Sequence, residues 1–269
     1  LGQHGEEAKV LAGGQSLIAM MKLRLAAPEH LIDINRIESL SGIAEQDGVL
    51  RIGAVVTQNE LIASALIGEK CPLIAEAAEQ IADPQVRNCG TIGGDLMHGD
   101  PGNDLPAVMM ALGATYILRG ADGDREVAAD GFYTGIFETG LRPQEILTEI
   151  RVPVPAPGSG HAYCKLKRKI GDFATAAAAV LLTLDGEVCS AVAIALTNLA
   201  PTAIRVAEPE ALLTVSTVDD ADIDAAAAAA SDAADPAEDL RGSVAYKKQM
   251  AGEMTRRALK LALERARGG

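Results

Sequence analysis

Two glycine pairs constrain this chain of 269 residues more than any other feature, and the first pair stands where a strand pattern gives way to a helix pattern. The first pair lies in residues 10–17 (VLAGGQSL), and the second lies in a run with five glycines at 90–102. Glycine lets a backbone approach a phosphate closely, and free N–H groups at a helix start favour an anion. The first segment matches neither the Walker loop nor the G-x-G-x-x-G fingerprint, so taken alone it is better explained as an ordinary turn between a strand and a helix. Together they predict two loops that meet on one extended, phosphorylated ligand.

A proline- and glycine-rich segment at 153–160 (PVPAPGSG) has the composition of a linker and predicts two domains, 1–155 and 161–269. Before it, strand patterns at 9–11, 31–34, 49–56, 114–118 and 146–152 are mixed with helix patterns. One helix is expected to begin with a capping box at Thr57 and Glu60 and to continue to about Ile67; another follows Pro72. After the linker, three strands at 162–169, 174–184 and 187–197 precede helices at 221–233 and 244–266. These patterns predict an α+β fold.

The second glycine run reads as a long, polar loop, and such loops inside compact domains are usually functional or disordered. Thr91 and the backbone amides around Gly93 and Gly94 are candidates for holding a diphosphate, and Asp104 for accepting a hydrogen bond from a ribose or ribityl hydroxyl. The alternative is a surface loop of turn residues. The three aspartates of this run lack the spacing of a calcium loop, and no metal site is predicted.

A basic segment at 165–169 (KLKRK) is unusual in a chain with a net charge of −13. Strand alternation would place Lys165, Lys167 and Lys169 on one face. That face is either a solvated edge strand or a surface that meets an anionic cofactor or a partner subunit.

Composition excludes several classes of function. A sequence pI near 4.8 and 3% aromatic residues argue against nucleic-acid binding, and the chain lacks the basic face that an anionic membrane surface attracts. No apolar run is long enough for a membrane span. Four cysteines without a C-x-x-C pair provide no zinc or iron–sulfur ligand spacing and fit a reducing compartment. We expect a cytoplasmic protein, either free or at the inner face of the membrane.

Four segments together resemble the FAD-binding medium subunit of the molybdenum hydroxylases, a family that includes carbon-monoxide and xanthine dehydrogenases. They are residues 12–17 (AGGQSL), 91–95 (TIGGD), 100–106 (DPGNDLP) and 165–174 (KLKRKIGDFA). The resemblance extends over essentially the whole chain. It implies a two-part FAD-binding domain of the vanillyl-alcohol oxidase type, followed by a small domain with a three-stranded antiparallel sheet and helices. The chain begins with Leu1 rather than Met, and the resemblance implies about 20 further residues ahead of it, with one more strand.

The resemblance also implies a set of cofactor contacts. The diphosphate of FAD is expected on two loops, formed by Ala12, Gly13, Gly14, Gln15, Ser16 and Leu17 and by Thr91, Gly93, Gly94 and Asp95. Further contacts are expected from Ile81, Asp104, Leu147 and Lys165, with His98 as a modulator near the flavin ring and Phe173 where a relative has tyrosine beside that ring.

Two positions in these loops depart from the family pattern. Gln15 stands where His is frequent, and Asp95 stands where Ser or Asn is common. A carboxylate near a diphosphate would be repelled unless its side chain turns away.

In this family the substrate chemistry takes place at a molybdenum cofactor on a large subunit, and two [2Fe–2S] clusters on a small subunit relay electrons. The resemblance therefore implies an electron-transfer subunit, without a catalytic acid, base or nucleophile of its own, that passes electrons to quinone, NAD or another acceptor. A dimer of heterotrimers is expected, with carbon monoxide as first choice of substrate ahead of purines, aldehydes and N-heterocycles. Two alternatives remain open: a self-sufficient flavin oxidase and a non-enzymatic scaffold subunit.

Overall fold

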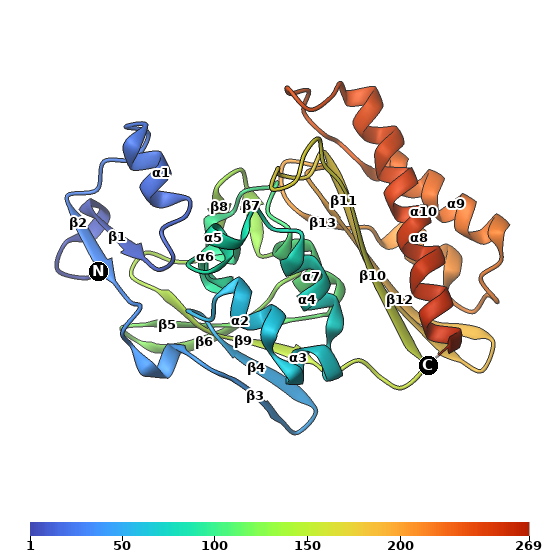
Figure 1. The fold of residues 1–269 in the computed structure, drawn as a ribbon, viewed down its shortest axis with the longest axis horizontal. Helices are drawn as coiled ribbons and strands as arrows, with labels where there is room; N and C mark the ends of the chain where they lie inside the picture. Colours follow the sequence, from blue (N-terminus) through green and yellow to red (C-terminus); the bar gives the residue numbers. More distant parts are fainter. Residues whose placement is uncertain (269) are drawn as a thin grey trace.

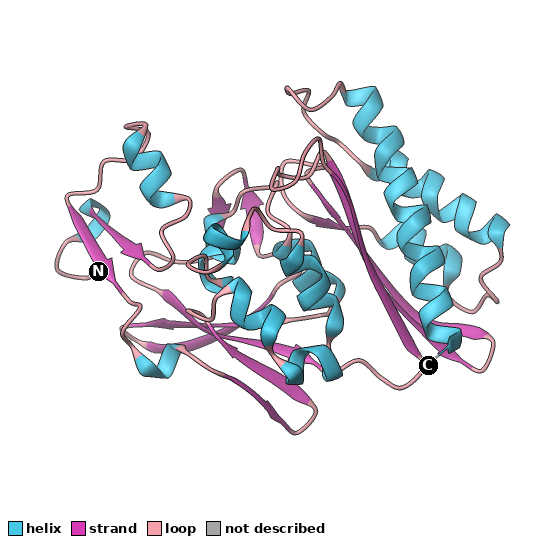
Figure 2. Ribbon diagram, in the orientation of Figure 1, coloured by secondary structure: helices cyan, strands magenta, loops and turns pink. Residues whose placement is uncertain are grey.

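The computed structural model describes residues 1–268, and Gly269, the last residue of the predicted second domain, lies outside them. A small N-terminal unit, a central sheet with helices on one face, and a C-terminal sheet with its own helices follow one another along the molecule (Figures 1 and 2). Mixed helices and strands confirm the α+β class.

The N-terminal unit is a strand–loop–helix–strand arrangement after a short 3-10 turn, η1 (Gly5–Glu7). Strands β1 (Ala8–Leu11) and β2 (His30–Asp33) pair in parallel, and helix α1 (Leu17–Lys22) lies in the connection between them. A parallel pair needs such a crossover. The first glycine pair falls between β1 and α1, as the sequence predicts.

The central unit is a five-stranded antiparallel sheet in the order β3-β4-β9-β5-β6. Its strands are β3 (Ile43–Gln46), β4 (Val49–Gly53), β5 (Thr115–Gly120), β6 (Gly123–Ala128) and β9 (Ile146–Pro153). Its helices are η2 (Glu38–Leu40), α2 (Gln58–Ala63), α3 (Ala65–Lys70), α4 (Pro72–Glu79), α5 (Pro84–Arg87), α6 (Ile92–His98) and α7 (Leu105–Ala111), and a small hairpin is formed by β7 (Tyr133–Gly135) and β8 (Glu138–Thr139). All seven residues of α7 are buried, which places this helix in the core.

Two local predictions need correction. The capping box at Thr57 and Glu60 is confirmed, but the helix ends at Ala63 because Ser64 is extended and its hydroxyl accepts the Ile67 N–H to start α3. The second glycine run is not a loop throughout. Residues 92–98 form α6, which is capped at its start by the Thr91 hydroxyl and at its end by Gly99 in the left-handed region, at φ 68°.

The C-terminal unit is an antiparallel sheet in the order β10-β11-β12-β13, with helices α8 (Ala207–Leu213), α9 (Asp220–Ala233) and α10 (Val244–Gly268). Its three long strands are β10 (Ser159–Leu166), β11 (Ala176–Asp185) and β12 (Val188–Thr197). A fourth strand, β13 (Ile204–Arg205), extends the expected three-stranded sheet. Two residues are too few to produce a strand pattern in a sequence.

The C-terminal sheet is buried on both faces. Ala177 and Ala179 of β11 join the core of the central unit, whereas Ala176 and Ala178 face the core of the C-terminal helices. On the central side, α4 packs against β10, and α7 packs against β11 and β12. An ion pair of 2.6 Å between Glu76 Oε2 and Arg265 Nη1 joins α4 to α10. The central and C-terminal units are therefore packed against each other, and residues of both line one cavity.

No helix among residues 1–268 combines the length and the apolar character that crossing a membrane requires.

Candidate cofactor site

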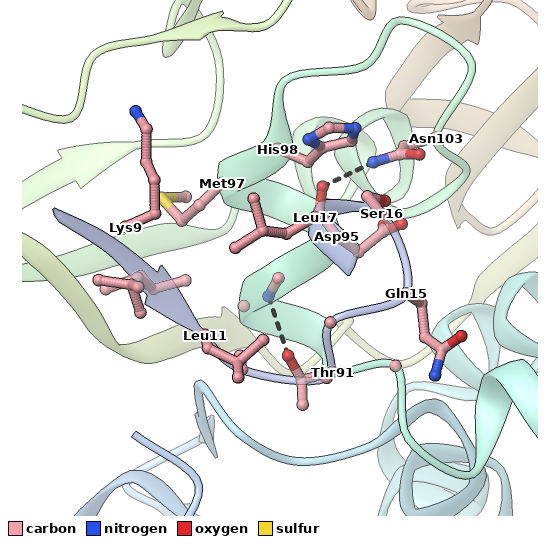
Figure 3. A pocket seen from close by; sticks show the side chains of 18 of the residues that line it. Lys9, Leu11, Gln15, Ser16, Leu17, Thr91, Asp95, Met97, His98 and Asn103 are labelled. Atoms are coloured by element: carbon pink, nitrogen blue, oxygen red, sulfur yellow. Dashed lines mark hydrogen bonds between the residues drawn. The ribbon is translucent and has the colours of Figure 1, made fainter. Parts of the chain in front are cut away.

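A cavity of about 970 Å³ lies where the N-terminal unit, the central helices and the β10–β11 loop come together (Figure 3). This volume is at the upper end of the range of about 300–1,000 Å³ that ligand pockets cover. Every residue that the sequence predicts as a cofactor contact lines it, namely Ala12, Gly13, Gly14, Gln15, Ser16, Leu17, Ile81, Thr91, Gly93, Gly94, Asp95, His98, Asp104, Leu147, Lys165 and Phe173. Segments as far apart in the chain as residues 12 and 173 thus share one wall.

The first glycine loop supplies a row of free backbone hydrogen-bond donors to the cavity. Within residues 1–268, the backbone N–H groups of residues 13–16 donate to no acceptor. A Cβ on Gly13 would overlap the carbonyl oxygen of Cys89 and come within 2.7 Å of the Gly90 Cα, so only glycine lets the two loops touch. Gly14 has a φ of +70°, which turns the chain from β1 toward α1. These N–H groups form a cradle that suits an anionic diphosphate.

The second glycine loop plays a different part from the predicted one. The N–H groups of Gly93 and Gly94 are already used, since Gly93 donates to the Ala54 carbonyl at 2.9 Å and Gly94 to the Thr91 hydroxyl at 3.0 Å. The proposal that these amides hold a diphosphate is therefore wrong for this structure. Gly93 has no room for a Cβ beside Ala54, and Gly94 is exposed. Gly93 and Gly94 thus form a floor of the cavity without side chains, and a Cβ on Gly94 would lie 4.0 Å from the Cβ of Ala12 in the first loop.

The Asp95 carboxyl group is buried beside the start of α7. Its Oδ2 atom is buried without a hydrogen-bond partner among the described residues, and the carboxyl group receives the Leu105 N–H at the start of α7. The Asn103 side chain donates to the Asp95 carbonyl oxygen at 2.8 Å (Figure 3). Burial, followed by the nearby Asp104 carboxylate, raises the pKa of Asp95 to about 8. A buried, neutral Asp95 removes the repulsion that its position in the motif suggests.

Asp95→Asn is expected to stabilise the fold increasingly as the pH rises. The folded pKa of Asp95 lies above its unfolded value, so the stability that the protonated group contributes is complete below about pH 4 and is lost as pH rises toward 8. Asparagine does not titrate, and the difference in unfolding free energy between variant and wild type should grow by up to about 1.4 kcal/mol per pH unit in that window. Urea denaturation of the full chain between pH 5 and 8 measures it. A difference independent of pH would show that Asp95 is ionised in the fold.

Asp104 is the acceptor of a buried polar cluster that joins the central unit to the C-terminal unit. Its Oδ2 pairs with Lys165 Nζ at 2.7 Å, and its Oδ1 accepts a hydrogen bond from the Tyr163 hydroxyl. Lys165 also donates to the Gln80 carbonyl at 3.1 Å, and its side chain is 1% exposed. Burial raises the pKa of Asp104, while Lys165 lowers it. Both oxygens are engaged, so a ribose hydroxyl would share a carboxylate that already binds two donors.

The solvated-edge explanation of the basic segment is wrong for Lys165 and Lys167. Lys167 Nζ donates to the Gln80 side chain at 2.8 Å, which places it at the junction between the two units rather than in free solvent. Lys169 lies beyond the end of β10 at Leu166, so the three lysines do not share a strand face. The prediction from strand alternation fails because β10 ends at Leu166, whereas the basic segment continues to Lys169.

Aromatic groups also line the cavity. The rings of His98 and Phe137 lie 5.0 Å apart between centroids, and burial lowers the pKa of His98. Phe173 is 46% exposed at the mouth. Sequence reasoning missed Phe137 and Arg142, which line the same cavity. Both belong to irregular segments without a motif, and nothing in the sequence signalled them.

Potential metal ligands gather elsewhere in the described residues. Glu7, Glu29 and His30 have ligand atoms within 4.8 Å of one another, but all three are exposed on the N-terminal unit. This cluster does not belong to the cavity wall.

Comparison with known proteins decides the family. Residues 1–155 match the model of the FAD binding domain in molybdopterin dehydrogenase, and residues 161–262 match that of the CO dehydrogenase flavoprotein C-terminal domain. The chain belongs to this family of flavoproteins. The carbon monoxide dehydrogenase medium chain of Hydrogenophaga pseudoflava is 53% identical over 98% of this chain and 92% of its own length. A subunit of the 6-hydroxypseudooxynicotine dehydrogenase complex of Paenarthrobacter nicotinovorans is 39% identical over 99% of this chain and 90% of its own length.

Solved structures of the family agree with the fold. A carbon monoxide dehydrogenase from Hydrogenophaga pseudoflava superposes with a TM-score of 0.97 at 54% identity, covering 98% of this chain and 92% of the other. Quinoline 2-oxidoreductase from Pseudomonas putida 86 superposes with a TM-score of 0.90 at 31% identity, and the match covers 97% of this chain and 90% of the other. The flavoprotein fold is thus shared by enzymes named for different substrates.

Proposed function

We propose that this chain is the FAD-carrying electron-transfer subunit of a molybdenum hydroxylase that oxidises carbon monoxide. It would take electrons from [2Fe–2S] clusters of a small subunit and pass them to an external acceptor. The observation that carries the proposal is the cradle of free N–H groups at residues 13–16, which opens into a cavity large enough for a dinucleotide. Scaffold function alone would not require unpaired donors at this point.

The residues present fit the cofactor. Free amides and the glycine floor suit a diphosphate, and Leu147, Phe137 and Phe173 add apolar lining that suits a ring. FAD, when bound, supplies the electron-accepting group. The chain binds and orients it, and the buried Asp104–Lys165 pair keeps the two units that form the cavity in register.

The choice of carbon monoxide rests on similarity. Relatives named for this substrate are more similar to the chain than the relative named for a nicotine derivative. The alternative is a flavin subunit of a xanthine, aldehyde or N-heterocycle dehydrogenase, because the same fold carries those names too. A self-sufficient oxidase is less well supported, since about 110 residues after the linker form a packed sheet and helices rather than a second binding domain.

We place the chain with a large molybdenum subunit and a small iron–sulfur subunit, as two heterotrimers, in the cytoplasm. Cys71, Cys89, Cys164 and Cys189 are free thiols, which fits a reducing compartment.

Reduction of the bound flavin by substrate tests the function. We expect carbon monoxide, added without oxygen to the complex purified with its co-expressed subunits, to bleach the flavin absorbance. Xanthine, an aldehyde and quinoline serve as competing substrates under the same conditions. Bleaching by one of these instead of carbon monoxide would select the alternative, and bleaching by none would leave the electron-transfer proposal without support.

A further inference from the structure

The loop between β10 and β11 carries Phe173 to the mouth of the cavity. The Phe173 ring lies on Gly102, where an added Cβ would meet the ring at 3.2 Å. Thr175 N–H closes the loop on the Leu166 carbonyl at 2.8 Å, and the Asn198 side chain donates to the Ala174 carbonyl at 2.6 Å. The loop is therefore anchored at its C-terminal end, while the ring itself is half exposed.

Arg241, from the connection between α9 and α10, reaches this loop from a part of the chain about 70 residues away. Its Nη2 donates to Asp172 Oδ1 at 3.2 Å, and its Cζ lies 5.7 Å from the centroid of the Phe173 ring. The same Asp172 oxygen accepts the Phe173 N–H at 3.0 Å, and the other pairs with Arg168 at 3.2 Å. One carboxylate thus links the guanidinium to the backbone that carries the ring.

Asp239 fixes the backbone of Arg241. The Arg241 backbone N–H donates to Asp239 Oδ1 at 2.8 Å. Asp239 also pairs at 2.9 Å with Lys247, a lysine of α10 whose side chain is 2% exposed. The Nε atom of Arg241 is buried and has no hydrogen-bond partner among the described residues. Burying a donor without a partner costs free energy. The hydrogen bonds of this guanidinium therefore do not by themselves account for its position.

We propose that Arg241 is a positioning residue of the flavin site, which holds the Phe173 ring against bound FAD and keeps a positive charge beside that ring. The inference rests on the proposed FAD function. A guanidinium over an aromatic face contributes more when water is excluded, and a bound flavin would exclude water from the half-exposed ring. The connection between α9 and α10 would then act on the cofactor site through Phe173, although Arg241 does not line the cavity.

The test compares Arg241→Gln, Arg241→Lys, Phe173→Leu and the double variant Arg241→Gln/Phe173→Leu in the complex with its partner subunits. Arg257→Gln is the matched control, because Arg257 pairs with Glu253 on an exposed face of α10. Readouts are the dissociation constant of FAD, the shape of the flavin absorption band and the flavin reduction potential. A merely structural arginine would change the unfolding midpoint but not the band or the potential.

We expect Arg241→Gln to weaken FAD binding by roughly three- to thirtyfold and to shift both the band and the potential, with Arg241→Lys in between. The dissociation constant of FAD for the double variant should be no higher than that of the single variant that binds FAD less tightly. Both changes remove the same contact, that of Arg241 with the Phe173 ring. Unchanged FAD binding, band and potential in a folded Arg241→Gln complex would overturn the inference, as would independent effects that multiply in the double variant. A wild-type complex that holds no FAD would instead overturn the proposed function.

Discussion

Gly13→Ala is expected to empty the flavin site, with FAD retention weakened by at least about a hundredfold. The added Cβ would overlap the carbonyl oxygen of Cys89, and both contacting atoms are backbone, so the two loops must separate. Separation moves the free N–H groups of residues 13–16 away from the floor of the cavity. Losing two charge-assisted hydrogen bonds at about 1.5 kcal/mol each gives this factor. Flavin content of the purified complex, before and after added FAD, measures it.

Gly68→Ala is the matched control for this prediction. Gly68 lies in α3, and a Cβ there meets nothing within 4 Å. Alanine favours a helix over glycine, so this variant should be as stable as wild type or up to about 1 kcal/mol more stable, with full FAD content. Normal FAD content in Gly13→Ala would contradict the claim that the first glycine loop is the diphosphate cradle.

Lys165→Met is expected to destabilise the chain by about 3–5 kcal/mol. The substitution leaves the Asp104 carboxylate buried beside Tyr163 without its cation, and an uncompensated buried charge is costly. It also removes the bond from Lys165 to the Gln80 carbonyl, which joins β10 to the end of α4. Urea denaturation of the full chain at pH 7 measures the loss.

The exposed pair of Lys260 with Asp220 provides the control, because an ion pair in solvent contributes little and Lys260→Met should leave the stability nearly unchanged. Adding Asp104→Asn to Lys165→Met should recover part of the lost stability, since the unpaired charge is then gone. Equal effects of Lys165→Met and Lys260→Met would contradict the assignment of Lys165 as a buried partner of Asp104.

Much of the site could be predicted from the sequence because its signals are local. A glycine pair between a strand and a helix pattern, a Thr-x-x-Glu capping box and a Thr before two glycines each depend on neighbours within a few residues. The family resemblance then joined motifs that lie far apart, and the structure places all of those residues around one cavity.

The parts that failed depend on contacts between distant segments. Whether the Gly93 N–H is free is decided by the Ala54 carbonyl, and nothing near residue 93 reveals that partner. Lys165 reads as a solvated lysine until α7 brings Asp104 beside it. Arg241 is separated from Phe173 by about 70 residues of sheet and helix, so its place over the ring follows only from the tertiary packing.

The most direct test of the flavin assignment is the identity and amount of flavin released by acid from the complex purified with its co-expressed subunits. We expect FAD, one per copy of this chain, with the cofactor absent from the Gly13→Ala complex. A wild-type complex that releases no flavin and does not take up added FAD would contradict the assignment and leave a scaffold subunit as the remaining explanation.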